Sequence, residues 1–239
     1  MSGVWLILPT YNEAENIEAI VAAALPRLAS TGLDHRILVV DDGSPDGTGQ
    51  IADRLASELS GRVEVLHRTS KDGIGPAYLA GFARALAGGA DLLMEMDSDF
   101  SHDPAYIPGL VAAARRADLV LGSRYVPGGG VEDWGLGRRL ISRGGSLYAR
   151  LILGIPVNDL TGGFKCFNRR VLEALDLTGI DADGYGFQIE MTYRAVQAGF
   201  TVAEVPIVFR DRRVGSSKMS ARIAVEAFWK VPLLRLRSR

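Results

Sequence analysis

The chain has 239 residues, of which 47% are hydrophobic and 23% are charged, and its formal net charge is −1. This composition suffices for one sizeable hydrophobic core and predicts a single domain followed by a tail. The near-neutral charge gives no reason to expect a nucleic-acid partner, and the one cysteine, Cys166, excludes an internal disulfide.

Apolar runs alternate with amphipathic stretches through the first half of the chain. We predict strands at residues 4–8, 36–40, 63–66 and 92–96, and helices at about 12–29, 48–59 and 76–86. This alternation predicts an open, mostly parallel α/β sheet with helices on both faces. Ligands bind such sheets at the carboxyl ends of the strands. The polar clusters after Leu8, Val40 and Met96 are therefore expected to meet in one cleft.

A glycine-rich segment follows a further short strand at 119–121. Residues 122–137 are too polar and too broken for the core, so we expect a mobile loop on the side where a second substrate enters. The N-terminus has no expected secretion signal, and no run approaches the roughly 18 apolar residues of a membrane-spanning helix. We therefore expect a cytoplasmic protein that meets any membrane at its surface.

Two aspartates, Asp97 and Asp99, follow the predicted strand 92–96. Residues two apart in an extended chain point to the same side, so the two carboxylates repel unless a cation lies between them. Carboxylate oxygens suit Mg²⁺ or Mn²⁺, which would neutralise charge on a diphosphate leaving group. A structural alternative stays open, in which Asp97 ends the strand and Asp99 or Ser101 caps the next helix.

Polar residues also follow the first two strands. Asp41 and Asp42 can accept hydrogen bonds from a base or a ribose, but the sequence Asp-Asp-Gly-Ser also suits a turn and a helix cap. The sequence Pro9-Thr10-Tyr11-Asn12-Glu13 offers a nucleoside an aromatic face and an acceptor, or simply begins a helix.

Cationic residues gather in the predicted loops. Guanidinium groups match phosphate oxygens in bidentate fashion, although most surface arginines are simply solvated. The candidates are Arg124, Arg138, Arg139, Arg143, Arg210, Arg212, Arg213 and Lys218.

Several other enzyme classes have no support in this sequence. The three histidines, His35, His67 and His102, are scattered and give no metal pair and no nucleophilic triad. There is no phosphate-binding loop that ends in Gly-Lys-Ser/Thr, and no Gly-x-Gly-x-x-Gly follows the first strand. Kinases and nicotinamide dehydrogenases are therefore disfavoured.

Four segments, in this order, resemble the family 2 glycosyltransferases of GT-A fold. They are Leu8–Glu13, Val40–Thr48, Asp97–His102 and Gly122–Tyr125. Three more, Ile141–Gly144, Asp159–Phe164 and Asp211–Lys218, resemble dolichol- and polyprenol-phosphate mannose synthases. The likeness spans about Val4 to Lys218. It implies inverting transfer of mannose from GDP-mannose to a polyprenyl (dolichyl-type) phosphate, with a β-linked product.

The resemblance also implies roles for individual positions. Asp99 and Ser101 would hold Mg²⁺ or Mn²⁺; some members of the family have Gln at the Ser101 position, so water would complete the coordination here. Catalysis is implied for Asp97 and for four cations that would neutralise the phosphates, Arg124, Arg138, Arg212 and Lys218. Donor binding is implied for Pro9, Tyr11, Glu13, Val40 and Asp42 around the guanosine, and for Asp97, Ser98 and Asp99 at the sugar diphosphate.

The chemistry agrees with these residues. A lipid phosphate is already an anion near neutral pH, so it needs placement and charge screening rather than a general base. Two other functions stay open: a polyprenyl-phosphate glucosyltransferase that uses a UDP-sugar, and a catalytically silent nucleotide-sugar-binding regulator. Glu190 is a candidate for orienting a sugar hydroxyl, with a structural ion pair as the alternative.

The C-terminal segment 216–239 predicts attachment to a membrane surface. Residues 217–239 contain six basic residues and one acidic residue, a balance of +5, interleaved with large apolar side chains. This composition is typical of an interfacial amphipathic segment without a transmembrane helix; a core-packing helix with a solvated basic tail is the alternative. We thus expect a GT-A domain over 1–215, followed by this segment. The protein is expected to be peripheral at the cytoplasmic face, with recruitment by a separate membrane protein as a further hypothesis.

Overall fold

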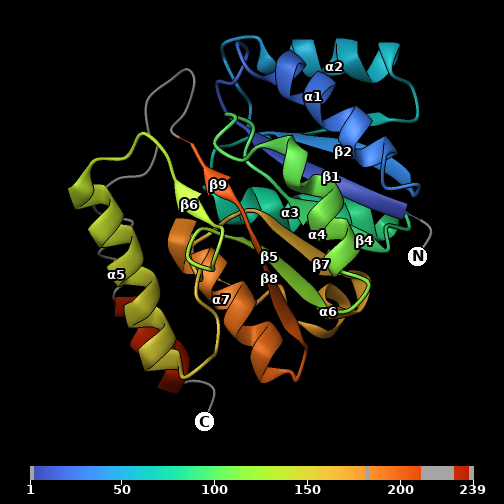
Figure 1. The fold of residues 1–239 in the computed structure, drawn as a ribbon. Helices are drawn as coiled ribbons and strands as arrows, with labels where there is room; N and C mark the ends of the chain where they lie inside the picture. The colour runs from blue at the N-terminus through green and yellow to red at the C-terminus, as the bar shows by residue number, and fades with distance from the viewer. Residues whose placement is uncertain (1–2, 181–183, 211–228, 237–239) are drawn as a thin grey trace.

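The computed structural model describes residues 3–180, 184–210 and 229–236. Its main feature is a seven-stranded sheet in the order β3-β2-β1-β4-β7-β5-β8, in which only β7 runs antiparallel to its neighbours (Figure 1). The strands are β1 (Gly3–Thr10), β2 (Asp34–Asp41), β3 (Val63–His67), β4 (Leu92–Glu95), β5 (Leu119–Ser123), β7 (Lys165–Asn168) and β8 (Val202–Pro206). A second, two-stranded sheet pairs β6 (Gly130–Val131) with β9 (Val208–Phe209).

Helices cover both faces of the large sheet. One face packs against α1 (Ile17–Ala29), α2 (Thr48–Glu58), the short 3₁₀ helix η1 (Pro104–Tyr106) and α4 (Ile107–Ala113). The other packs against α3 (Ile74–Ala87), α5 (Leu136–Leu153), α6 (Arg169–Ala174) and α7 (Gly184–Gln197). The predicted α/β sheet with helices on both faces is therefore confirmed.

The alternation of side chains along the strands builds two hydrophobic cores. In β1, Trp5 and Ile7 belong to the core that contains α3 and α7, whereas Leu6 and Leu8 belong to the core that contains α1 and α4. Successive residues of a strand point to opposite faces, so a strand buried on both sides is apolar throughout. This is the physical reason for the continuous apolar runs in the sequence.

The structure corrects part of the expectation of a polar loop over residues 122–137, although most of residues 125–137 is an exposed or half-exposed loop as predicted. Gly122 and Ser123 complete the buried strand β5, and β6 pairs with β9 within the same stretch. Arg124 and Trp134 are 6% exposed each. Glycine and charge suggested solvent, but the amides of Gly130 and Glu132 donate to the carbonyls of Ile207 and Phe209, and the large side chains of Arg124 and Trp134 pack inward.

Helix α5 lies to one side of the sheet, next to the helical residues 229–236 (Figure 1). The guanidinium of Arg235 donates to the carbonyl of Leu153 at the end of α5, which joins the two helices. Several large apolar side chains of this pair face solvent: Leu136, Leu140, Ile141, Leu147, Leu151, Trp229, Leu233 and Leu236. Within the described ranges, none of the helices has the length and hydropathy needed to span a bilayer.

Candidate active site

The carboxyl ends of β2, β1 and β4 meet at one edge of the sheet, as the strand pattern predicted. The β1–β2 register sets Pro9 beside Val40. The Ser98 hydroxyl, which follows β4, donates to the carbonyl of Pro9 at 3.2 Å. The amide of Asp42 donates to the carbonyl of Thr10 at 3.0 Å. Backbone pairing of adjacent parallel strands therefore brings the three polar segments together.

A polar pocket of about 90 Å³ opens at this edge. Its walls come from the loop after β4, the end of β5, the loop before β7, and the starts of α3, α5 and α7. The lining residues are Ile74, Asp97, Ser101, His102, Arg124, Trp134, Arg138, Thr161, Gly162, Gly163, Gly184, Tyr185, Gln188 and Phe209.

The two aspartates of the loop after β4 differ in environment. The side chain of Asp97 is 28% exposed, and Tyr78 of α3 donates its hydroxyl to Asp97 Oδ1 at 3.4 Å. Asp99 is buried, and its Oδ1 accepts the amide of Ser101 at 3.0 Å. Burial, reinforced by Asp97, raises the pKa of the Tyr78 phenol well above its ordinary value, so Tyr78 stays a donor.

His102 is a pocket residue that the sequence reasoning did not single out. It is 2% exposed, and its Nδ1 accepts the backbone amide of Asp97 at 3.2 Å. Burial lowers the pKa of His102 to about 4, although the nearby Asp99 carboxylate opposes this shift. The imidazole is therefore neutral at physiological pH and positions the backbone of the Asp97 loop.

Arg124 forms a buried ion pair at the end of β5. Its Nε and Nη2 donate to the two carboxylate oxygens of Asp159 at 2.7 and 2.6 Å, and Nη2 also donates to Thr161 at 2.8 Å. Burial alone would lower the pKa of this guanidinium, but the Asp159 carboxylate outweighs it and raises the pKa. The charge of Arg124 is thus largely balanced within the protein.

Arg138 stands at the junction between the polar pocket and a second cavity. Its guanidinium lies 4.1 Å from the ring centre of Trp134, a cation–π contact. One turn further along α5, Ser142 accepts a hydrogen bond from the hydroxyl of Tyr125 at 2.7 Å. The second cavity has a volume of about 760 Å³ and a largely apolar lining: Trp134, Gly137, Arg138, Ile141, Ser142, Gly144, Gly145, Tyr148, Thr161, Tyr185, Ile189 and Val231.

The residues expected around the nucleoside also lie together at the ends of β1 and β2. The ammonium of Lys71 is 4.1 Å from the ring centre of Tyr11, and Arg68 donates to Asp42 at 2.6 Å. Burial raises the pKa of Asp42 against the lowering influence of Arg68. The side chain of Val40 is part of the hydrophobic core, so only its backbone is available to a ligand. Glu13 accepts from the Asn16 amide at 2.9 Å and is 8% exposed.

Some expected site residues are placed differently or fall outside this description. Arg212 and Lys218 lie outside the described residues. Glu190 is 5% exposed and accepts from Nε of Arg194 at 2.8 Å, which is the structural alternative considered for it. Pocket residues absent from the first expectations include His102, Trp134, Thr161, Tyr185 and Gln188, and Tyr78 contacts the pocket residue Asp97. His102 and Thr161 stand inside sequence segments that resembled the family, and that position was the available signal.

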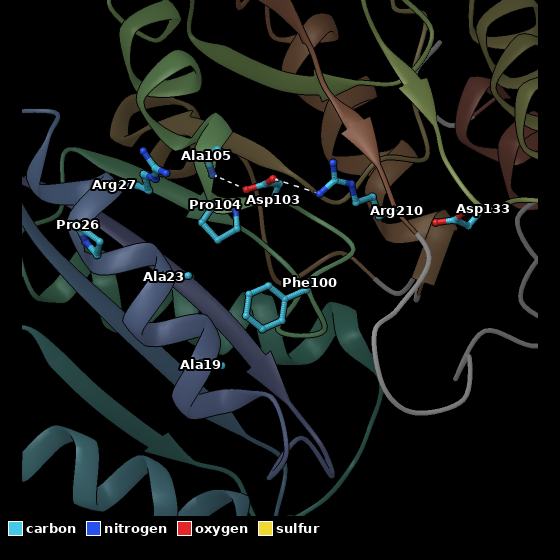
Figure 2. Close-up of a pocket in the computed structure, with 10 residues that line it drawn as sticks. All are labelled: Ala19, Ala23, Pro26, Arg27, Phe100, Asp103, Pro104, Ala105, Asp133 and Arg210. Carbon is cyan, nitrogen blue, oxygen red and sulfur yellow. Dashed lines mark hydrogen bonds and ion pairs between the residues drawn. The ribbon is translucent and has the colours of Figure 1, made fainter.

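A larger cavity of about 990 Å³ lies between α1 and η1 and shares no described lining residue with the polar pocket (Figure 2). Phe100, whose φ of 62° is left-handed, turns its ring to this cavity, while Asp97 and Ser101 line the polar pocket. Arg210 of this cavity lies 2.9 Å from Glu132 and 3.9 Å from Asp103. The expected site residues Asp97, Ser101, Arg124 and Arg138 line the smaller, polar pocket and not this cavity.

Comparison with known proteins identifies the family. The model of glycosyl transferase family 2 matches residues 5–176, which include the three strand ends and both aspartates. The chain is a family 2 glycosyltransferase.

Two relatives match this glycosyltransferase over nearly its whole length. The polyprenol monophosphomannose synthase of Mycolicibacterium smegmatis is 48% identical over 235 residues, 98% of this chain and 87% of the relative. The undecaprenyl-phosphate mannosyltransferase of Micrococcus luteus is 48% identical over 236 residues, 99% of this chain and 95% of the relative.

Solved structures confirm the GT-A fold of this glycosyltransferase. Glucosyl-3-phosphoglycerate synthase from Mycobacterium tuberculosis, in complex with Mn²⁺, UDP and glucosyl-3-phosphoglycerate, gives a TM-score of 0.67 at 22% identity. The match covers 99% of this chain and 80% of that one. A complex of the same enzyme with Mn²⁺, UDP and phosphoglyceric acid gives 0.68 at 22% identity, over 99% and 78% of the two chains.

The buried Arg124–Asp159 pair generates a stability prediction. Substitution Asp159→Asn keeps the shape but leaves the guanidinium buried without its counter-charge, which typically costs about 3–5 kcal/mol. We expect the free energy of unfolding, measured by urea titration, to fall by that order. Asp34→Asn is the control, because Asp34 pairs with Arg62 at the surface, with 63% of its side chain exposed, and exposed pairs contribute little. Equal, small effects of both substitutions would show that the buried pair does not stabilise the fold.

Proposed function

We propose that this glycosyltransferase transfers mannose from GDP-mannose to a polyprenyl (dolichyl-type) phosphate with inversion at the anomeric carbon. The names of the two 48% identical relatives support the polyprenyl-phosphate acceptor and the mannosyl group. The proposed product is polyprenyl phosphate β-mannose.

The observation that carries this proposal is the junction of two unlike cavities. The polar pocket contains Asp97 and Arg124, whereas the second cavity is largely apolar and runs along α5 to Val231. Both are lined by the same four residues, Trp134, Arg138, Thr161 and Tyr185. A polyprenyl phosphate has the same division, an anionic head on an apolar chain. Arg138 at the junction is suited to bind the head, with the chain in the apolar cavity.

The loop after β4 fits a divalent cation. Ser101 Oγ is buried and has no hydrogen-bond partner among the described residues. It lies beside the buried Asp99 carboxylate, so the protein offers hard oxygen donors of the kind that Mg²⁺ or Mn²⁺ prefers. In the described residues no three His, Cys, Asp or Glu side chains form a metal cluster, so phosphate and water would supply the other ligands. We propose that Asp99 and Ser101 hold the ion beside Asp97 and Ser98.

The residues of the chain then bind and orient two phosphate-bearing substrates. When bound, the ion would neutralise negative charge on the departing diphosphate. Arg138, with Arg212 and Lys218 from outside the described residues, is proposed to screen the charge of the acceptor phosphate. One acceptor oxygen forms the new bond to the anomeric carbon as the bond to GDP breaks, and attack from the opposite side inverts that carbon. The acceptor oxygen is already ionised, so no side chain must remove a proton.

The nucleoside is proposed to bind at the ends of β1 and β2. Tyr11 offers its ring, and Asp42 a carboxylate that matches the N–H groups of guanine. Pro9, Glu13 and Val40 complete this part of the site, with Val40 acting through its backbone. In this structure Arg68 donates to Asp42, and the ammonium of Lys71 lies over the ring of Tyr11. Nucleotide binding at these two side chains would displace Arg68 and Lys71.

The exposed apolar side of α5 and residues 229–236 supports a position at a membrane surface. Leu136, Leu140 and Leu151 of α5 are 79%, 72% and 71% exposed, and Trp229 of the neighbouring helical residues is 67% exposed. Arg139, Arg143 and Arg150 on α5 supply positive charge near this surface. We propose that the pair of helices rests in the lipid interface at the cytoplasmic face and admits the acceptor through the apolar cavity. A separate membrane-protein partner remains part of this proposal.

A donor panel tests the reaction itself. Purified protein, a short-chain polyprenyl phosphate and Mg²⁺ or Mn²⁺ should convert GDP-mannose to a lipid-linked β-mannoside, detected by mass spectrometry and anomeric NMR coupling. UDP-glucose should give far less product. Preferential use of UDP-glucose would establish the polyprenyl-phosphate glucosyltransferase instead, and nucleotide binding with no transfer from any donor would indicate a silent regulator.

The metal site predicts a selective loss in Asp99→Asn. The substitution keeps an oxygen that can accept the Ser101 amide but removes the charge that the ion requires. We expect transfer to fall by about a hundredfold or more, with a weaker Mn²⁺ dependence of GDP binding in calorimetry. Asp103→Asn is the matched control, because Asp103 Oδ1 accepts the amide of Ala105 in the same kind of turn at 2.8 Å. Wild-type transfer by Asp99→Asn in the presence of EDTA would refute the metal site.

The membrane surface predicts the behaviour of a double variant. Leu140→Glu with Leu147→Glu should abolish sedimentation with anionic liposomes, because two charges replace apolar contacts. Ala22→Glu with Gln50→Glu adds the same charge at exposed positions of α1 and α2 and should still bind. Binding should also weaken as salt rises, since each basic residue near an anionic surface contributes about 1 kcal/mol. Equal binding of the two double variants would show that α5 does not face the lipid.

A further inference from the structure

Gln188 of α7 has an unsatisfied polar atom at the wall of the polar pocket. The residue is only 5% exposed, and its Oε1 has no hydrogen-bond partner among the described residues. Buried side-chain oxygens are rarely left unpaired, because the hydrogen bonds to water that they lose on burial are then not replaced. Gln188 also lines the pocket with Asp97, His102 and Arg124. Gln188 therefore lines the pocket with an amide whose hydrogen bonds the described residues do not complete.

Two glycines leave room for this amide. A Cβ atom at Gly163 would lie 3.4 Å from Gln188 Nε2 and 3.7 Å from His102 Cε1. Gly162 and Gly163 both line the pocket, so a ligand can approach the Gln188 amide across bare backbone. A larger residue at Gly163 would stand between them.

A buried polar group behind the pocket fixes the backbone and side chain of Gln188. Lys165 Nζ donates to the Gln188 carbonyl at 2.7 Å, and Thr192 donates to the same oxygen at 3.1 Å. Lys165 stands opposite Glu95 in the β7–β4 register, and neither side chain is exposed. Burial raises the pKa of the Glu95 carboxyl to about 7, and the nearby Lys165 and Gln188 oppose this rise. Lys165 and Glu95 thus form the buried polar group against which Gln188 is held.

The transferred sugar is the part of the substrates that this position suits. The same pocket contains Asp97 and Arg138, which are proposed to lie at the donor diphosphate and the acceptor phosphate. The reacting hexose lies between those two phosphate groups during transfer, and its hydroxyls need hydrogen-bond partners. We propose that the side-chain amide of Gln188 hydrogen-bonds to one hydroxyl of the transferred sugar, and that Lys165 and Glu95 are positioning residues for it. The inference rests on the proposed function, since it concerns the sugar of that reaction.

The test is a set of donor analogues, each lacking one hydroxyl of the sugar, used with wild type and Gln188→Leu. In wild type, loss of the contacted hydroxyl should lower kcat/KM about ten- to a hundredfold, because the Gln188 amide then stays unpaired. In Gln188→Leu that analogue and the complete donor should have equal kcat/KM. The other analogues should keep the kcat/KM ratios to the complete donor that they have in wild type. GDP affinity, measured by calorimetry, should be unchanged, which also shows that the variant is folded.

Matched variants distinguish the loss of the Gln188 contact with the sugar from a general loss of activity. Gln197→Leu, at the exposed end of the same helix, should keep every wild-type ratio. Glu95→Gln should weaken the discrimination at the same hydroxyl, with unchanged GDP affinity, whereas a merely structural role would slow all donors equally. If Gln188→Leu unfolds, Gln188→Met replaces it in the same comparison.

The outcomes distinguish this inference from the proposed function. Unchanged analogue ratios in both Gln188 variants would overturn the contact, even if wild type transfers mannose. A wild type that uses glucose rather than mannose would overturn the proposed function, and the contact would then be judged with deoxyglucose donors by the same ratios. If a donor binds but is not turned over, the comparison between each analogue and the complete donor is made with their binding affinities instead of kcat/KM.

Discussion

The Arg124–Asp159 ion pair ties the two halves of the site together. Arg124 ends the buried strand β5, and Asp159 stands in the loop before β7; the pair is fully buried and bidentate. Asp159 also accepts the backbone amide of Arg124 at 2.9 Å. Separating these charges inside the protein would leave each without solvation, so the loop with Thr161 must stay against the end of β5. The shape of the polar pocket, and its border with the apolar cavity, follow from that attachment.

This constraint has a cost for the chemistry of Arg124. Its Nε and Nη2 donate to Asp159 and Thr161, so its charge is already largely balanced within the protein. In the proposed reaction, the cations that screen phosphate would therefore come mainly from elsewhere, with Arg138 on α5 as the described example. Under that proposal, different elements carry the rigid part of the site and the part that meets the acceptor.

Much of the polar edge of the sheet was predictable because it rests on local rules. Strand ends followed by Asp42, or by Asp97 and Asp99, are visible in the sequence, and parallel pairing dictates that adjacent ends meet. The fold class follows from the alternation of strands and helices along the chain. The first two strands and the strand that ends before Asp97 were placed within a few residues, because continuous apolar runs mark strands buried on both faces.

The sequence by itself determined the sheet and the polar segments that meet at its edge, while the ligands of that edge stay a prediction. Tertiary structure decided which residues of the second half, beyond the expected Arg124 and Arg138, reach that edge. The four-residue strand β7 inserts antiparallel between β4 and β5, which sets Lys165 opposite Glu95 and brings Gln188 to the pocket. It also decided that Arg124 is buried in an ion pair. Such pairings join residues far apart in the chain, and their energies depend on burial and mutual distance, which no local pattern encodes.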